Sequence, residues 1–349
     1  MTRVLVVDDS ALMRRYLGGI LNDAGGFEVS SARDGEDALE QLEREPADVV
    51  TLDINMPRVN GLDCLARIMA EHPCPVVMVS SLTTDGALAT LEALELGAVD
   101  YVAKPGGTVS LNIEAVAGEL VSKVRAASKA RVRGARPSVK SNGSLRVANP
   151  PARPRVASGR RAKLVLVGAS TGGPGILGDI LGPLPAGFGA PIVIAQHIPA
   201  SFSESLANRL NNVCAVRVEE VNEPRELEPG LVLIARGGAD VVVRRRGSSF
   251  VARSVPSDAS LNWHPSVERL MRSAMEVCEP SAILAVQLTG MGDDGAGAIA
   301  ELHRAGAHTI AESEESAVVW GMPGEVVRLG GASEILPADA VPDALLRCC

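Results

Sequence analysis

The chain has few aromatic residues, no paired cysteine motif and no long apolar run. Aromatic side chains make up only 2% of its 349 residues, and base-stacking surfaces depend on them. The six cysteines are scattered without a C-x-x-C pair or the spacing of metal ligands, so we expect reduced thiols and neither disulfides nor zinc. The apolar run at residues 4–7 is too short for a signal peptide, and no later stretch approaches a membrane span. We therefore expect a soluble, cytoplasmic protein without membrane insertion.

Positive charge is concentrated in one segment. Between Lys123 and Lys163 there are thirteen Lys or Arg and no acidic residue, although the whole chain has a net charge of −8. The segment is rich in Pro, Gly, Ser and Ala, which is typical of a linker. It could bind nucleic acid or an anionic membrane, but it contains no aromatic residue, which favours a solvated tether. We expect two domains, residues 1–122 and 161–349, a linker at 123–160, and no nucleic-acid partner.

Short apolar runs alternate with segments of helical period in the first domain. Continuous apolar runs are typical of strands buried on both faces. The alternation therefore predicts a doubly wound α/β fold with a five-stranded parallel sheet. The runs are VLVV (4–7), FEVSSA (27–32), DVVTL (48–52), VVMVS (76–80) and YVAK (101–104).

Polar side chains follow these strands, at the sheet edge where open α/β sheets bind ligands. The set consists of Asp8 and Asp9 after the first strand, Asp53 after the third, Ser80 after the fourth and Lys104 after the fifth. Crowded carboxylates repel one another unless a hard cation neutralises them, and Mg²⁺ suits their oxygens. With that ion and an ammonium group to balance charge, one carboxylate could attack a phosphoryl group. Helix capping by strand-end acids is the alternative, but it explains only one or two of these positions.

The segments VVDDS, TLDINMPRVNG, VMVSS and YVAKP resemble the receiver domain of bacterial response regulators, which is flavodoxin-like. The resemblance implies that Asp53 accepts a phosphoryl group. The other roles that it implies are Mg²⁺ binding by Asp8, Asp9 and Asp53, contact with the phosphoryl group by Lys104, and switching by Ser80 and Tyr101.

Three apolar runs of the second domain end in reactive side chains. LVLVGAS ends at Ser170, PIVIAQH at His197, and AILAVQLTGMGDD at Asp293 and Asp294. Serine, histidine and a carboxylate are the residue set of an acyl hydrolase that needs no cofactor, because the imidazole takes the serine proton and the carboxylate orients the imidazole. An α/β-hydrolase has the order Ser, Asp, His, so we expect a different doubly wound, mainly parallel α/β domain. The residues alone do not choose between the two aspartates.

Two other interpretations of this domain are open. Residues 168–172 fit the G-x-S-x-G turn that exposes a serine, but a glycine-rich loop at a helix start could also hold phosphate. The spacing matches neither the dinucleotide nor the P-loop motif, which disfavours the phosphate interpretation. His264, beside Trp263 at an expected helix start, competes with His197 for the role of base. Glycines around the aspartate pair leave amide N–H groups free to face an oxyanion.

The motifs GASTGG, QHIP, NWHPSV, LTGMGDDGA and VVWGMPGEVV, in this order, resemble the catalytic domain of the chemotaxis protein-glutamate methylesterase family. The resemblance implies that Ser170 is the nucleophile, His197 the general base and acid, and Asp294 the orienting carboxylate, since Asp294 precedes Gly-Ala. It implies an oxyanion hole that includes the amide of Met291. The implied activity is phosphorylation-regulated hydrolysis of glutamate methyl esters, and of glutamine amides, on methyl-accepting chemotaxis receptors. The implied phosphodonor is the chemotaxis histidine kinase.

Two features depart from the family pattern. Where the family commonly has A-P-G followed by a basic residue and a histidine, this chain has IARGGADVVV (234–243), with Arg236 in place of proline and no histidine. The linker is also long and basic. These departures are compatible with a paralogue that serves a chemosensory pathway other than motility. A separate alternative is a catalytically idle regulator that docks receptors or kinase, which only a measurement of activity distinguishes from the enzyme. A DNA-binding regulator is disfavoured because the second domain shows no helix-turn-helix pattern.

Overall fold

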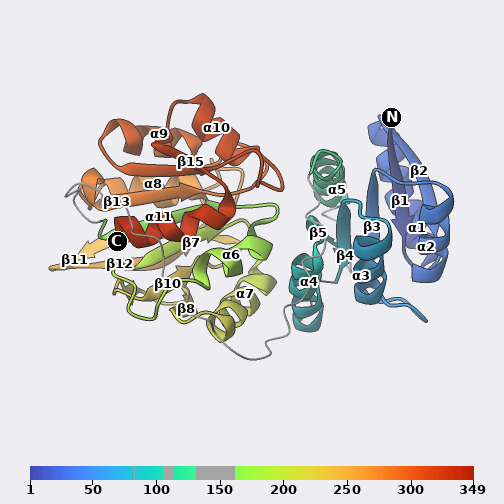
Figure 1. Ribbon diagram of the computed structural model, residues 1–349, viewed down its shortest axis with the longest axis horizontal. Helices are drawn as coiled ribbons and strands as arrows, with labels where there is room; N and C mark the ends of the chain where they lie inside the picture. The colour runs from blue at the N-terminus through green and yellow to red at the C-terminus, as the bar shows by residue number, and fades with distance from the viewer. Residues whose placement is uncertain (82, 105–112, 131–161) are drawn as a thin grey trace, which may run out of the picture.

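The computed structural model describes residues 1–81, 83–104, 113–130 and 162–349. Within these residues the chain forms two α/β units that lie side by side, and helices α4 and α5 of the first unit face the second (Figure 1). Most of the predicted linker, residues 131–160, lies outside the described residues.

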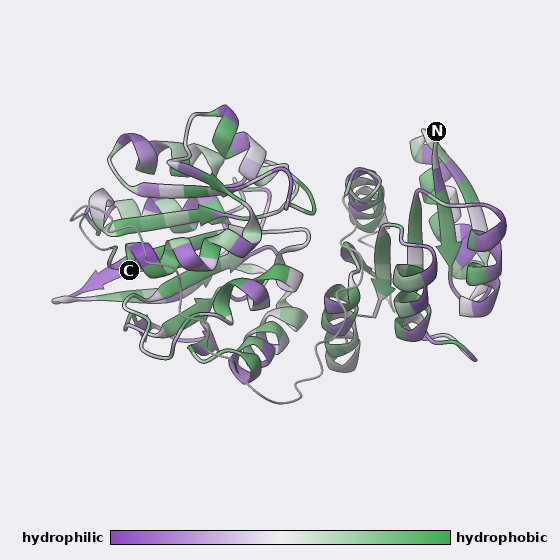
Figure 2. Cartoon of the chain, viewed as in Figure 1, coloured by the Kyte–Doolittle hydropathy of each residue, from purple (hydrophilic) through white to green (hydrophobic). Residues whose placement is uncertain are grey.

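The first unit is a five-stranded parallel sheet with the strand order β2-β1-β3-β4-β5, as the sequence predicts. Apolar residues fill the strands and the inner helix faces, whereas polar residues cover the outer faces of the helices (Figure 2). The strands are β1 (Thr2–Val7), β2 (Phe27–Ala32), β3 (Val49–Asp53), β4 (Val76–Ser80) and β5 (Asp100–Ala103). The helices are α1 (Ala11–Ala24), α2 (Gly35–Arg44), α3 (Gly61–Glu71), α4 (Thr84–Leu96) and α5 (Ile113–Ala127).

Helix α5 continues past residue 122, the predicted end of the first domain. Val124 and Ala127 of its last turns are buried in the core of the first unit. Lys123 also points inward, with only 16% of its side chain exposed and an ion pair to Asp100. The basic side chains of this stretch resemble those of the linker, so composition alone places the boundary too early.

The second unit contains a seven-stranded sheet with the order β15-β14-β13-β6-β7-β10-β8 and a three-stranded sheet β11-β12-β9. All pairings in the large sheet are parallel and those in the small sheet are antiparallel, which confirms the mainly parallel α/β fold. The strands are β6 (Leu164–Ala169), β7 (Ile192–Gln196), β8 (Arg217–Glu220), β9 (Arg225–Glu226), β10 (Leu231–Ile234), β11 (Ala239–Arg246), β12 (Ser249–Pro256), β13 (Ile283–Gln287), β14 (His308–Glu312) and β15 (Glu334–Leu336).

Helices flank the large sheet on both faces (Figure 1). They are α6 (Gly173–Leu181), α7 (Ala200–Val213), α8 (Val267–Met275), α9 (Ala296–Arg304), α10 (Met322–Arg328) and α11 (Val341–Cys348), with short 3₁₀ helices at Pro280–Ala282 and Ala338–Ala340. Strands β7, β10 and β8 lie on one side of β6, and the later strands β13, β14 and β15 lie on its other side. The strand order therefore reverses next to β6. Ligand sites of open α/β sheets lie at such a reversal. Among the helices described, none has the length and apolar character to cross a membrane.

Candidate functional site

Ser170 and His197 emerge from neighbouring strands at the reversal point. Ala169 of β6 pairs with Gln196 of β7, and the His197 amide donates to the Ala169 carbonyl at 2.9 Å. The turn after Ser170 requires a glycine, because Gly172 has φ +79° and a Cβ there would lie 2.7 Å from Cβ of Val318. The backbone therefore sets both reactive side chains at one sheet edge.

The imidazole of His197 is paired with a carboxylate of the second half of the domain. Its Nε2 lies 2.8 Å from Oδ2 of Asp294, which is 7% exposed, whereas the neighbouring Asp293 is exposed to solvent. Burial raises the pKa of Asp294, but the hydrogen bond from His197 and the amides of Val267 and Glu268 outweigh it and hold that pKa below its ordinary value. Asp294 is thus an ionised carboxylate oriented toward the imidazole.

Ser170 and His197 line the same cavity of about 500 Å³. Because Nε2 faces Asp294, Nδ1 is the nitrogen left to take a proton, and it is buried without a hydrogen-bond partner among the described residues. Within the described part of the chain the Ser170 hydroxyl forms no hydrogen bond to this nitrogen. Catalytic hydrogen bonds often shorten only when substrate binds, so this geometry is compatible with a serine that becomes activated in the complex.

Met291 also lines this cavity, in the loop after β13. The preceding Gly290 is fixed because its amide donates to Val319 and its carbonyl accepts from Gly321 and Met322. The Met291 amide donates to no acceptor among the described residues. It therefore has no partner among the described residues that would compete with an oxyanion, the role that the resemblance implies.

The structure adds Gln196, which sequence reasoning did not select. Its side-chain amide donates to the carbonyls of Ser170 at 2.9 Å and His197 at 3.0 Å, so it joins the two strand ends. A polar residue at the end of the otherwise apolar run PIVIAQ was the available signal. His264, the competing base, lines the same cavity, but its Nδ1 bonds to Asp240 at 3.0 Å instead of to Asp294.

A second cluster lies at the carboxyl ends of the strands in the first unit. Carboxylate oxygens of Asp8, Asp9 and Asp53 lie within 4.8 Å of one another, and this donor set suits Mg²⁺. Nζ of Lys104 is 2.8 Å from Oδ2 of Asp8 and from Oδ2 of Asp53. Burial, together with the charge of Asp8, raises the pKa of Asp53 although Lys104 opposes the shift. A cation would relieve this crowding of charge.

The two predicted switch residues lie on neighbouring strands of the first unit. Ser80 at the end of β4 is buried, and its hydroxyl donates to the Gly86 carbonyl at 3.3 Å. Tyr101 in β5 faces the second unit, where its ring stacks on Phe202 of α7 with centroids 4.8 Å apart. The tyrosine therefore connects the sheet of the acidic cluster to the second unit.

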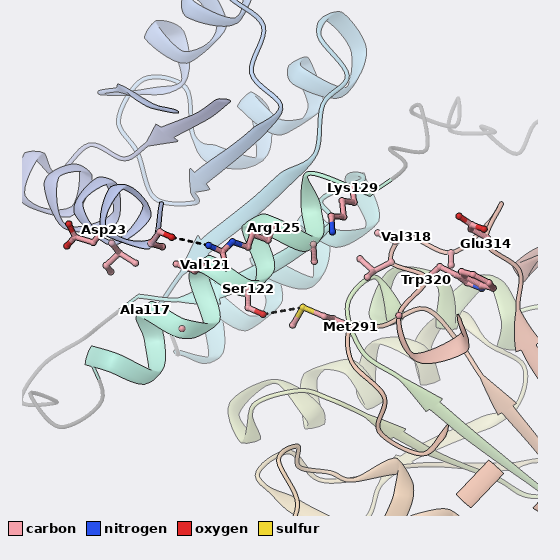
Figure 3. Close-up of a pocket in the computed structure, with 17 residues that line it drawn as sticks. Asp23, Ala117, Val121, Ser122, Arg125, Lys129, Met291, Glu314, Val318 and Trp320 are labelled. Carbon is pink, nitrogen blue, oxygen red and sulfur yellow. Dashed lines mark hydrogen bonds between the residues drawn. The ribbon is translucent and has the colours of Figure 1, made fainter. Parts of the chain in front are cut away.

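The first unit covers the cavity that contains Ser170. The Thr171 hydroxyl donates to the carboxylate of Asp100, and both residues line the cavity. Ser122 of α5 donates to Sδ of Met291 at 3.2 Å (Figure 3). A wider cleft of about 1020 Å³ lies between α1, α5 and the loop that ends at Gly321, and it shares Ser122 and Met291 with the cavity.

Away from the cavity, α4 packs against α6 and α7. Leu91 and Leu94 of α4 belong to the same buried apolar cluster as Ile176 and Phe202 of the second unit. Arg209 of α7 donates to the Leu91 carbonyl at 2.7 Å and forms an ion pair with Glu95. The covered arrangement is thus held by apolar contacts and by polar contacts at its edge.

Comparison with known proteins gives one family match in each of the two units. A family model described as CheB methylesterase matches residues 165–345, and one described as response regulator receiver domain matches residues 4–115. The chain is 51% identical to protein-glutamate methylesterase/protein-glutamine glutaminase 3 of Rhodospirillum rubrum, over 99% of this chain and 95% of that protein. It is 48% identical to the protein of the same activity, numbered 2, of Carboxydothermus hydrogenoformans, over 99% and 98%.

A solved structure is similar to the second unit. The crystal structure of the CheB methylesterase catalytic domain of Thermotoga maritima matches with a TM-score of 0.52 and 37% identity, over 54% of this chain and 99% of that one. The full-length relatives and the two family matches lead to one conclusion: the chain belongs to the CheB methylesterase family and carries an N-terminal response-regulator receiver domain.

Proposed function

We propose that this protein is a phosphorylation-regulated serine hydrolase. Its substrates are the γ-methyl esters of glutamate, and the side-chain amides of glutamine, on the cytoplasmic helices of methyl-accepting chemotaxis receptors. The observation that carries the proposal is the pairing of His197 with a buried Asp294 in the cavity that Ser170 lines. The names of the full-length relatives support the same chemistry.

The reaction follows from the positions of these groups. The Ser170 hydroxyl attacks the ester carbonyl while Nδ1 of His197 takes its proton. The oxyanion that forms faces the amide of Met291. The imidazolium, stabilised by Asp294, then gives its proton to methanol as the C–O bond breaks. Water attacks the acyl-enzyme by the same route and releases glutamate; with a glutamine substrate, ammonia leaves in place of methanol.

Regulation is assigned to the receiver. Asp53 accepts a phosphoryl group from the chemotaxis histidine kinase, and Lys104 contacts that group. Asp8, Asp9 and Asp53 would hold Mg²⁺, which neutralises charge on the phosphoryl oxygens. The cluster of three carboxylates around one ammonium group supports this assignment.

Phosphorylation would act by uncovering the cavity around Ser170. An α-helix with its side chains is about 10–12 Å across, whereas the receiver contributes six residues to the lining of a cavity of about 500 Å³ around Ser170. A receptor helix therefore needs the two domains to separate. Phosphorylation of Asp53 would favour the separated state through Tyr101, which stacks on Phe202 in the covered state.

The proposal predicts methanol release from methylated receptor membranes by the intact protein. Acetyl phosphate with Mg²⁺ should raise the rate by about 5–150-fold, the range of typical allosteric couplings. Asp53→Asn should show only the basal rate, with or without the phosphodonor, because the amide cannot accept the phosphoryl group. Glu28→Gln, at an exposed position of β2, is the matched control and should respond as the wild type does. No release under any of these conditions would contradict the proposed activity.

Loosening the domain contact should activate the protein without phosphorylation. Arg209→Ala removes the bond to the Leu91 carbonyl and the ion pair with Glu95, and it leaves the cavity intact. We expect the basal rate to rise severalfold and the further stimulation by acetyl phosphate to shrink by the same factor, because both changes favour the separated state. Arg217→Ala, which removes a surface arginine paired with Glu219 and Glu228, should leave both rates unchanged. An unchanged basal rate in Arg209→Ala would argue against the switch.

A further inference from the structure

Asp240 is a buried carboxylate in the segment that departs from the family pattern. It lies in β11, is 1% exposed, and accepts four hydrogen bonds. Oδ1 accepts from the Ser266 amide at 2.8 Å and from Nδ1 of His264 at 3.0 Å. Oδ2 accepts from Nη1 of Arg269 at 2.7 Å and from the Asp258 amide at 3.1 Å. A buried charge is tolerated only when it is fully partnered in this way, so the loop from 258 to 266 is fixed by one side chain.

This network is joined to the carboxylate that orients His197. Ser266 donates through its amide to Asp240, and its hydroxyl donates to Oδ1 of Asp294 at 3.0 Å. The next two residues donate their amides to Asp294 as well, Val267 at 2.7 Å and Glu268 at 3.0 Å. Asp240 therefore fixes the start of α8, and the start of α8 fixes Asp294.

The same loop also contacts the catalytic imidazole directly. The ring of Trp263 is parallel to that of His197, with an interplanar angle of 2° and centroids 5.9 Å apart. On another side Trp263 lies against Gly292, where a Cβ would be 2.9 Å from the indole ring. His264, the next residue, lines the cavity and bonds to Asp240. Because His264 follows Trp263 directly, the bond between His264 and Asp240 also keeps the indole beside the imidazole of His197.

We propose that Asp240 and His264 form a second carboxylate–imidazole pair that positions the catalytic one. The pair holds Trp263 against the face of His197 and Ser266 against Asp294, so the imidazole is constrained both by its neighbour in the stack and by its carboxylate. Asp240 and His264 are positioning residues, and they carry no proton of the reaction. This inference rests on the proposed function, because it assigns His197 and Asp294 their catalytic roles.

The first test is Asp240→Asn in the full-length protein, assayed with acetyl phosphate and Mg²⁺. Both oxygens of Asp240 accept from N–H groups, so the amide of asparagine must face a donor on one side. We expect kcat to fall about 10–100-fold, as when a small displacement disturbs catalytic geometry or the outer partner of a functional imidazole is lost. KM should stay within about twofold, because the pair acts through His197 and not through the substrate.

His264 gives a second test that disturbs the fold less. His264→Leu removes the donor to Asp240 but leaves the other three, so the fold is retained, and kcat should fall as in Asp240→Asn. His264→Asn places an amide N–H close to the position of Nδ1 and should restore most of the rate. The matched control is His308→Leu, because His308 also bonds a carboxylate, Glu334, at 2.8 Å, but it begins β14 at the opposite end of the sheet. The control should keep the wild-type kcat.

The fluorescence emission of Trp263 reports whether its indole keeps its place beside His197. Trp263 and Trp320 are the two tryptophans of the chain, so Trp320→Phe leaves Trp263 as the reporter. Because the indole of Trp263 is stacked on the ring of His197, its emission should change in His264→Leu and should be restored in His264→Asn. The inference is overturned if Asp240→Asn and His264→Leu keep the wild-type kcat and the wild-type emission of Trp263. If Asp240→Asn does not fold, His264→Leu alone decides. Activity that survives Ser170→Ala would instead overturn the proposed function.

Discussion

Ser170→Ala is expected to lower the rate of methanol release by about 10⁶-fold, the loss seen when the nucleophile of a comparable serine triad is removed. Alanine offers no oxygen to form the acyl-enzyme, while Nδ1 of His197 and the amide of Met291 stay in place. Some catalysis over water should remain, because groups that stabilise the oxyanion act on a directly attacking water too. The measurement is single-turnover methanol release from methylated receptor membranes, with acetyl phosphate and Mg²⁺ present so that the site is open.

The control for this variant is Ser248→Ala, at an exposed position in the turn between β11 and β12, which should keep the wild-type rate. Receptor binding by Ser170→Ala should also be unchanged, since the side chain is small and the cavity around it is otherwise intact. A rate within about tenfold of wild type would exclude Ser170 as the nucleophile. Normal binding without any turnover in the wild type would favour the idle regulator that docks receptors.

The strand pattern predicted most of the architecture because it depends on local sequence. Continuous apolar runs identify buried parallel strands, and parallel strands end at a common edge. That geometry brings Ser170 close to His197 and Asp8 close to Asp53, although each pair is separated by many residues in the chain. The end of α5 was missed because Lys123 and Arg125 look like linker residues, and only the structure reveals that Lys123 is turned inward.

The finer parts of the site depend on contacts that no local pattern encodes. Asp293 and Asp294 are equivalent as residues, and they differ because one is exposed while the other is buried beside the start of α8. Asp240 reads as one polar residue at the start of an apolar strand, and its four donors come from a loop and a helix that follow it in the sequence. The bond between Thr171 and Asp100 joins two domains, so its existence depends on how they dock.

Asp294→Asn is expected to lower kcat by about 10⁴-fold, as when the orienting carboxylate of a serine triad becomes an amide. Here two changes act together: the charge that pairs with His197 is lost, and one backbone N–H loses its acceptor. Oδ2 accepts from both His197 and Val267, and Oδ1 accepts from Ser266 and Glu268. The amide group of asparagine must therefore face a backbone N–H whichever way it is turned. One buried donor is left unpaired, at a cost of about 1–3 kcal/mol, so Tm should fall together with kcat.

The pH dependence of stability separates the loss of the charge from the loss of the acceptor, because only the charge depends on pH. The folded-state pKa of Asp294 is lowered, so its ionised form stabilises the native state above the unfolded pKa of about 3.9, and this contribution is lost as pH falls through the lower folded pKa. The Tm difference between wild type and Asp294→Asn should therefore be largest near neutral pH and shrink in acid. Asp293→Asn, at the exposed neighbour, should keep both kcat and Tm. Equal losses from the two variants would show that negative charge near the cavity matters, and not the bond between Asp294 and His197.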